Sequence, residues 1–140
     1  MPSLSALNSV LPLIGVLIGA GLQFIFGKTL ESRKQLSLQK GQAYADYFRA
    51  MSAAGTQGSS KETLALATDA KTRVCIYGSP EVVSRLGDFE RAGAIVASGD
   101  GQAAVVRLLK AMRKDVGVAN EALLEDDLRH ALFGRGGSLG

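Results

Sequence analysis

The side chains that most often carry catalysis are scarce in this chain. It contains one histidine, His130, and one cysteine, Cys75, which lies in a Val-Cys-Ile run. Without a second histidine or cysteine, one chain cannot assemble a zinc site of those ligands or a Cys-His nucleophile pair. We expect Cys75 to be a small core residue and His130 to be a solvated residue near a helix end. The sequence therefore predicts no catalytic site, no metal and no cofactor, and does not indicate an enzyme.

Two charged clusters could bind a ligand without catalysing a reaction. Glu121 and Glu125 lie one helical turn apart, but they lack the spaced oxygen ligands of a calcium loop, so solubility at a helix surface explains them better. Arg107, Lys110 and Lys114 form a basic face on a predicted helix whose other side is apolar. Such a face could bind RNA, an anionic nucleotide or the acidic last helix of a neighbouring copy. A net charge of only +3 argues against dedicated nucleic-acid binding, and a solvated helix face is the alternative.

The distribution of charge divides the chain into two parts. Residues 1–27 contain no Asp, Glu, Lys, Arg or His, so all sixteen Lys and Arg and all thirteen Asp and Glu residues follow them. In the segment Val10–Phe26, Gln23 is the only polar side chain. About twenty apolar residues in a helix match the thickness of a bilayer core, about 30 Å. We therefore expect residues 1–27 to be a transmembrane anchor.

The flanks of this segment predict its orientation. Lys28, Arg33, Lys34 and Lys40 follow it, whereas no basic side chain precedes it. A cleaved signal peptide would have a basic start and a small-residue cleavage motif, and neither is present. The positive-inside rule places the N-terminus outside and the following domain in the cytoplasm. The four cations could also lie against anionic lipid headgroups.

A stripe of small and polar residues runs along the predicted anchor. Gly15, Gly19, Gln23 and Gly27 recur every four residues and so share one face of a helix. Gly15 and Gly19 form a GxxxG motif, which lets two helix backbones approach closely in lipid. Gln23 could hydrogen-bond to a neighbouring copy or line a narrow polar path in a ring. The alternative is that membrane helices are simply rich in glycine and that Gln23 reaches the interface.

The rest of the chain predicts helices and no strand, which makes the fold class all-α. We expect a stalk helix over residues 28–54, an antiparallel bundle of four or five short helices over residues 55–133, and a disordered tail over residues 134–140. The stalk should bury a stripe of four large side chains, Tyr44, Tyr47, Phe48 and Met51.

The bundle helices have recognisable start and stop signals. Ser59 with Glu62 predicts a capping box and a helix that ends at Gly78. Ser79-Pro80-Glu81 predicts the start of the next helix. The third shows the cleanest apolar period, and the last is acidic and runs from about 119 to 132. The predicted core positions of these helices are Leu64, Ala67, Ala70, Val74, Tyr77, Val82, Val83, Leu86, Phe89, Val96, Val105, Leu108, Leu109, Met112 and Val116.

Four segments carry a resemblance that covers most of the chain. After the apolar anchor come a basic, Gln-containing stalk (Arg33-Lys-Gln), an Ala-Tyr-x-Asp-Tyr-Phe helix (43–48), the segment Arg73–Val83, and a late Met-Arg-Lys-Asp (112–115). This order resembles a broad set of uncharacterised small bacterial single-pass inner-membrane proteins with a helical cytosolic domain. The resemblance implies a bacterial inner-membrane location.

More distantly, the layout is similar to the membrane-anchored accessory protein found beside RNA-targeting CRISPR effectors, an oligomeric ring with a helical cytosolic domain of the HEPN type. The chain departs from that family because no arginine lies four to six residues before His130. Ribonuclease-like chemistry is therefore not carried over. What the similarity implies is an oligomeric, membrane-depolarising mode of action.

Two functional hypotheses follow. The first is a homo-oligomeric inner-membrane protein that acts as a membrane-active or accessory component, with a pore-like role in antiviral defence as its most specific form. Its partners would be further copies of itself and the lipid bilayer. The alternative is a monomeric membrane tether whose helical cytosolic domain binds a protein or RNA partner through Arg107, Lys110 and Lys114.

Overall fold

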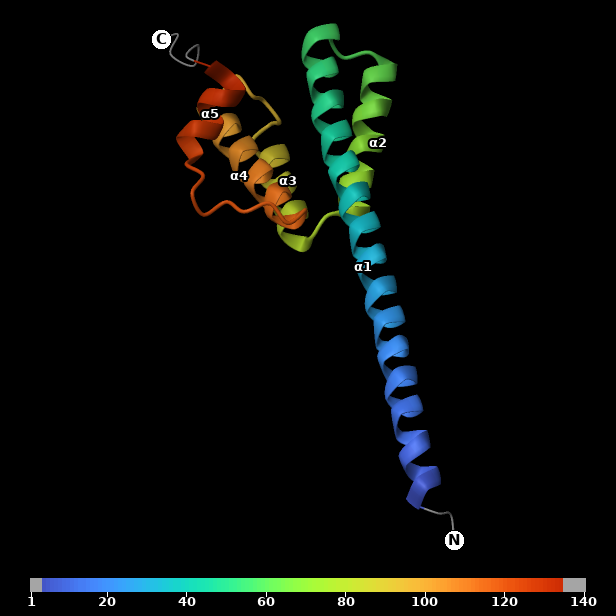
Figure 1. Ribbon diagram of the computed structural model, residues 1–140. Helices are drawn as coiled ribbons and strands as arrows, with labels where there is room; N and C mark the ends of the chain where they lie inside the picture. The colour runs from blue at the N-terminus through green and yellow to red at the C-terminus, as the bar shows by residue number, and fades with distance from the viewer. Residues whose placement is uncertain (1–3, 135–140) are drawn as a thin grey trace. The chain divides into compact units, whose positions relative to one another are not determined.

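The computed structural model describes the backbone of residues 4–134 and the side chains of residues 12–134. This part of the chain contains five helices and no strand, which confirms the all-α class (Figure 1). The helices are α1 (Leu4–Gln57), α2 (Lys61–Tyr77), α3 (Pro80–Arg91), α4 (Gly99–Asp115) and α5 (Glu125–Phe133). Gly134 ends α5, and the remaining residues of the predicted disordered tail lie outside the described part of the chain.

The chain forms two compact units, Met1–Leu36 and Ser37–Gly140. Helix α1 contributes to both, and it continues through Gly41 without a break. In the first unit, every described side chain from Pro12 to Leu36 is exposed. The second unit contains the buried side chains, and its core begins at Ala43 and Tyr44 on α1.

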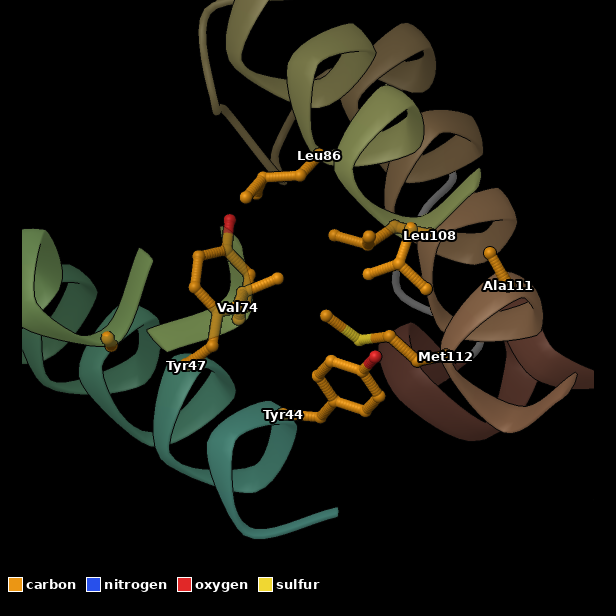
Figure 2. Close-up of a cluster of buried hydrophobic side chains, with 9 residues drawn as sticks. Tyr44, Tyr47, Val74, Leu86, Leu108, Ala111 and Met112 are labelled. Atoms are coloured by element: carbon orange, nitrogen blue, oxygen red, sulfur yellow. The ribbon is translucent and has the colours of Figure 1, made fainter. Parts of the chain in front are cut away.

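Four helices contribute to the main hydrophobic core of the second unit (Figure 2). The core residues are Tyr44 and Tyr47 from α1, Ala70 and Val74 from α2, Val82 and Leu86 from α3, and Leu108, Ala111 and Met112 from α4. Phe89, Ala104 and Val105 form a second cluster with Phe48, Met51 and Phe133. Burial of a large apolar side chain stabilises a fold by about 1.5–3 kcal/mol. Most of the predicted core positions are therefore confirmed.

The cap of α2 differs from the predicted one by one residue. Ser60, not Ser59, is the N-cap, and its side chain accepts a hydrogen bond from the Thr63 backbone N–H at 3.1 Å. The Thr63 hydroxyl accepts from the Ser60 N–H at 2.9 Å and donates to the Gly58 carbonyl at 3.0 Å. A hydroxyl can do both, whereas the carboxylate of Glu62 can only accept. The predicted Ser59–Glu62 box is therefore wrong.

Two side chains of α2 lie on a different face from the predicted one. Leu64 is 59 % exposed, and Cys75 is exposed. Val74 is fully buried, and the next residue of a helix points about 100° away from it because of the 3.6-residue period. Leu64 was predicted to be a core residue from its position on the helix, and Cys75 from its apolar neighbours; both predictions are wrong.

Helix α3 begins where it was predicted to begin, but it ends earlier than predicted. Helix α3 begins after the N-cap Ser79 with Pro80 in its first turn, as predicted. It ends in a Schellman motif, in which Gly93, at φ +88°, and Ala94 donate to the carbonyls of Glu90 and Phe89. Val96 therefore lies beyond the helix and is 39 % exposed, so its assignment to the core is wrong.

Helix α5 starts at Glu125, several residues later than predicted. A second Schellman motif ends α4 at Gly117, whose φ is +85°. The Asn120 side chain then donates to the Lys110 carbonyl at 2.8 Å and accepts from Arg113 at 3.0 Å. These bonds hold the chain in an irregular turn. The helix starts where acidic side chains can interact with its positive N-terminal end.

Candidate functional site

One helix in the described part of the chain is long and apolar enough to cross a membrane. It is α1, and none of its most apolar window is buried against the rest of the protein. The exposed fractions are high even for the largest side chains, for example 66 % for Leu17 and 70 % for Phe24. Soluble monomers rarely expose a contiguous apolar patch of more than a few hundred Å². The surface of this segment is thus suited to an apolar environment.

The predicted oligomer stripe lies on this exposed helix. Gly15, Gly19 and Gly27 adopt ordinary helical backbone angles, and a methyl group added to any of them would meet no atom within 4 Å. Gln23 on the same stripe is also exposed. The chain itself therefore does not require glycine at these positions. The stripe leaves open space at which another helix could approach the backbone.

Three of the four predicted flanking cations are exposed. Lys28, Arg33 and Lys34 lie at the surface, and the Lys28 ammonium lies 5.8 Å from the centre of the Phe24 ring. Lys40 differs, because its Nζ lies 2.8 Å from Asp115 Oδ1 and its side chain is only 15 % exposed. The expectation that Lys40 lies against lipid headgroups is replaced by this intramolecular ion pair.

The structure brings the predicted basic face, Arg107, Lys110 and Lys114, to the wall of one surface hollow of about 220 Å³. Acidic residues line the same hollow. Lys114 pairs with Glu81 at 3.1 Å, and Lys110 lies 3.6 Å from Glu125 on α5. The basic face was predicted as a possible binding site for the acidic last helix of a neighbouring copy. In the structure, this helix contacts the basic face of its own chain through Glu125. Exposed pairs of this kind contribute about 0–1 kcal/mol each.

Arg107 differs from the two lysines. It is exposed, and it forms no ion pair with any residue that the structure describes. Arg85 from α3 lines the same hollow, and its side chain pairs only loosely with Asp88, at 3.4 Å. Arg107 and Arg85 thus bring two guanidinium groups to the lining of this hollow, which the Lys114–Glu81 and Lys110–Glu125 pairs also line.

Asp115, at the C-terminal end of α4, is a polar centre that the sequence patterns did not reveal. Its carboxylate accepts hydrogen bonds from Lys40 Nζ at 2.8 Å, from the Tyr44 hydroxyl, and from the Ser79 backbone N–H at 3.1 Å. Its side chain is only 9 % exposed. A carboxylate with three protein donors has little capacity left for a substrate. Asp115 therefore connects α1, α4 and the start of α3 as a structural residue.

Burial and hydrogen bonding act in opposite directions on the pKa of Asp115. Burial of the carboxyl group raises it, but the hydrogen bonds from Lys40, Tyr44 and Ser79 outweigh burial and hold the pKa below its ordinary value. The pKa of Tyr44 is raised, first by burial and then by its hydrogen bond to the Asp115 carboxylate. The pair therefore persists as a neutral phenol and a charged carboxylate at neutral pH.

His130 and Cys75 lie apart from these features. Both are exposed, His130 on α5 and Cys75 on α2. Among residues 12–134, no group of three or more His, Cys, Asp or Glu side chains is placed to hold a metal ion.

Known proteins add no further information. No family model, no curated protein and no solved structure matches this chain.

Three of the four segments that carry the resemblance come together in the helical unit. Tyr44, Ser79 and Asp115 come from these three and share the hydrogen bonds around the Asp115 carboxylate. Asp46, from the segment 43–48, and Arg73, from the segment Arg73–Val83, form an ion pair at 3.0 Å. These residues thus hold one helical unit together, and the resemblance stays a prediction.

Proposed function

We propose that this chain is a single-pass protein of a bacterial inner membrane that self-associates through its anchor and presents a helical domain in the cytoplasm. The observation that supports the proposal most strongly is that every apolar side chain between Pro12 and Phe26 is exposed. Transfer of apolar surface out of water gains about 25 cal/mol per Å². A helix in hydrocarbon also satisfies its own backbone hydrogen bonds.

The orientation follows from the flank. Lys28, Arg33 and Lys34 remain exposed after Lys40 is assigned to Asp115, so three cations still follow the apolar segment. Cations close to a membrane helix are retained on the cytoplasmic side. We therefore assign the Ser37–Gly140 unit, which we interpret as an antiparallel bundle, to the cytoplasm.

Self-association is supported by the stripe of Gly15, Gly19, Gln23 and Gly27. Helices associate in lipid through close backbone packing and interhelical hydrogen bonds, and this stripe offers both. The glycines have no packing role within the chain. A narrow polar path along Gln23 and a membrane-active role in antiviral defence remain predictions, the first from the stripe and the second from the resemblance.

The experiment compares two substitutions in the same helix. Gly19→Leu fills the stripe, whereas Gly21→Leu adds the same side chain on another face, and neither position contacts the rest of the chain. Light scattering of the detergent-solubilised full chain should show an oligomer for the wild type and for Gly21→Leu, and a smaller species for Gly19→Leu. A wild-type monomer at every protein concentration would overturn the self-association.

A second candidate function is a monomeric tether that captures an anionic partner, protein or RNA, on the basic face. The observation that favours it is Arg107, which is exposed, is not paired with any described carboxylate, and lines the same hollow as Arg85. This candidate predicts partner capture that is independent of Gly19.

A further inference from the structure

Within the Ser37–Gly140 unit, the end of α1 and the whole of α2 form a hairpin whose two arms run in opposite directions (Figure 1). One side of the hairpin packs on α3 and α4 through the main hydrophobic core. Another side carries a surface hollow of about 340 Å³ between the two arms. All residues that line this hollow belong to α1 or α2, and none belongs to α3, α4 or α5. This side of the hairpin is therefore open to a partner.

Four charged side chains form a row across this side of the hairpin. Arg49 Nη1 lies 2.8 Å from Asp46 Oδ1, and Arg73 Nη1 lies 3.0 Å from Asp46 Oδ2. The other nitrogen of the same guanidinium, Arg73 Nη2, lies 2.6 Å from Asp69 Oδ2. The ion pairs thus join positive and negative groups in alternation, from Arg49 on α1 to Asp69 on α2. These two end members are the most exposed of the four, at 77 % and 57 %.

A row of four alternating charges is complementary to a second copy of itself. A two-fold axis that runs along the hairpin, between two copies, reverses a row that crosses from one arm to the other. Arg49 of one copy then lies opposite Asp69 of the other copy, and the same contact occurs twice. This axis also keeps α1 of both copies pointing in the same direction. Copies of one membrane protein require that, because they share one orientation.

The apolar residues of the hollow fit the same arrangement. Leu66 on α2 is 58 % exposed, and it lies one turn from Asp69 on the side of the α1–α2 loop. Ala50 and Ala53 on α1 line the same hollow, and Ala53 lies one turn from Arg49 on that side. In a two-fold pair, α2 of one copy faces α1 of the other. Leu66 would then meet the short alanine side chains of the other copy, which leave room for it.

We propose that this surface binds the same surface of a second copy in a parallel, two-fold pair. We call it the hairpin face and define it by the residues that make the contact, Asp46, Arg49, Ala53, Leu66, Asp69 and Arg73. Two arginines and two aspartates leave the face without net charge, which favours a second copy over a strongly acidic or basic partner. The contact is additional to the glycine stripe, but it rests on the proposed function, because the anchor gives the copies their common orientation.

The test exchanges the charges at the two ends of the row. In Arg49→Asp both ends are negative, and in Asp69→Arg both ends are positive. Each variant alone places like charges opposite one another twice, whereas a pair that contains one chain of each variant places opposite charges together twice. The mixture contains the same chains as the separate samples. Damage to the fold of either variant therefore persists in the mixture and cannot produce recovery.

The readout is resonance energy transfer between full chains in lipid vesicles, with donor or acceptor dye attached to Cys75. Cys75 is exposed and is the only cysteine of the chain. It follows Arg73 by two residues and so points about 200° away from it around α2, clear of the hairpin face. The controls are Arg129→Asp and Asp127→Arg, which change the net charge by the same amounts at exposed positions of α5.

The wild type should show energy transfer, and each exchange variant alone should show less. In the mixture of Arg49→Asp with Asp69→Arg, the association constant should be about 10-fold higher than for either variant alone, from two exposed pairs. The mixture of the two control variants should associate no more strongly than either control alone. Leu66→Ala should weaken association about 3–10-fold. Leu64→Ala should not, since Leu64 is 59 % exposed on the same helix but does not line the hollow.

The outcomes that overturn the proposal are distinct from failure of the proposed function. Equal energy transfer in the wild type, both exchange variants and their mixture would mean that the anchor alone holds the copies together and that the hairpin face is solvated or binds another protein. An equal gain in the control mixture would mean nonspecific attraction between chains of different net charge. Absence of transfer in the wild type would overturn both this contact and self-association through the anchor.

Discussion

The hydroxyl of Tyr44 donates a hydrogen bond to Asp115 Oδ2, across 71 positions of the chain. Lys40 and the backbone of Ser79 bind the same carboxylate, at 2.8 Å and 3.1 Å. This arrangement fixes the C-terminal end of α4 against α1 and against the start of α3. Because the donors come from distant segments, their loss should affect the stability of the whole helical unit.

Tyr44→Phe should destabilise the helical unit, and Tyr47→Phe should not. Tyr44 donates to a buried carboxylate, and a hydrogen bond to a charged group contributes about 1.5–3 kcal/mol. The Tyr47 hydroxyl has no partner among the described residues, so its removal should be neutral or stabilising. Thermal unfolding of the two variants in detergent, followed by circular dichroism, gives the comparison. Equal losses for the two variants would contradict the assignment.

Asp115 should make the stability of the unit depend on pH in the acid range. Its folded-state pKa is lowered, so the unfolded chain, with an aspartate pKa of about 3.9, takes up the proton first as the pH falls. The stabilisation is therefore complete above the unfolded-state pKa and is lost as the pH decreases through the folded-state pKa.

Asp115→Asn removes this contribution. It should cost about 2 kcal/mol at neutral pH, because it leaves Lys40 without its counter-charge in a largely buried site. The difference in unfolding free energy between wild type and variant should shrink between about pH 5 and pH 3. A difference that stays constant over this range would contradict the lowered pKa.

Gly101→Ala should be far more harmful than Gly99→Ala, although both residues lie in the first turn of α4. A Cβ on Gly101 would lie 1.6 Å from the backbone oxygen of Ile95. Only a shift of the backbone could relieve this clash, because the clashing atom is not part of a flexible side chain. A Cβ on Gly99 would meet no atom within 4 Å. Overpacking of this kind costs about 1–3 kcal/mol or more. Comparable unfolding temperatures for both variants would show that the loop is not packed as described.

Reversal of charge at Arg107 tests the second candidate function. Arg107→Glu should abolish capture of an anionic partner, because this guanidinium is not paired with any described carboxylate. Arg129→Glu, on α5 and outside the lining of the hollow, is the control for net charge. Pull-down of cytosolic protein and RNA by each variant, with the oligomer size measured in parallel, separates the two functions. Equal capture by both variants would exclude the basic face.

The sequence predicted the apolar periods well, because a helix repeats its buried face every three to four residues. Val105, Leu108 and Met112 are buried as the period requires, and so are Tyr44 and Tyr47. The apolar period does not determine at which residue a helix is capped. The capping box of α2, which starts at Ser60, was therefore predicted one residue too early.

The polar centre at Asp115 could not be predicted in the same way. Its partners are 36 to 75 positions away, and only the packing of the helices brings them together. The apolar surface hollow lined by Tyr47, Met51 and Leu64 gave no signal either, because alanines from three separate elements form much of its wall.

Carbonate extraction of the membrane fraction tests the membrane anchor most directly. The full chain, expressed alone in a bacterium with residues 1–27 intact, is washed at high pH and centrifuged. Because the side chains from Pro12 to Phe26 have no cover within the protein, the chain should stay in the pellet and be released only by detergent. Recovery of the intact chain in the supernatant would contradict the anchor.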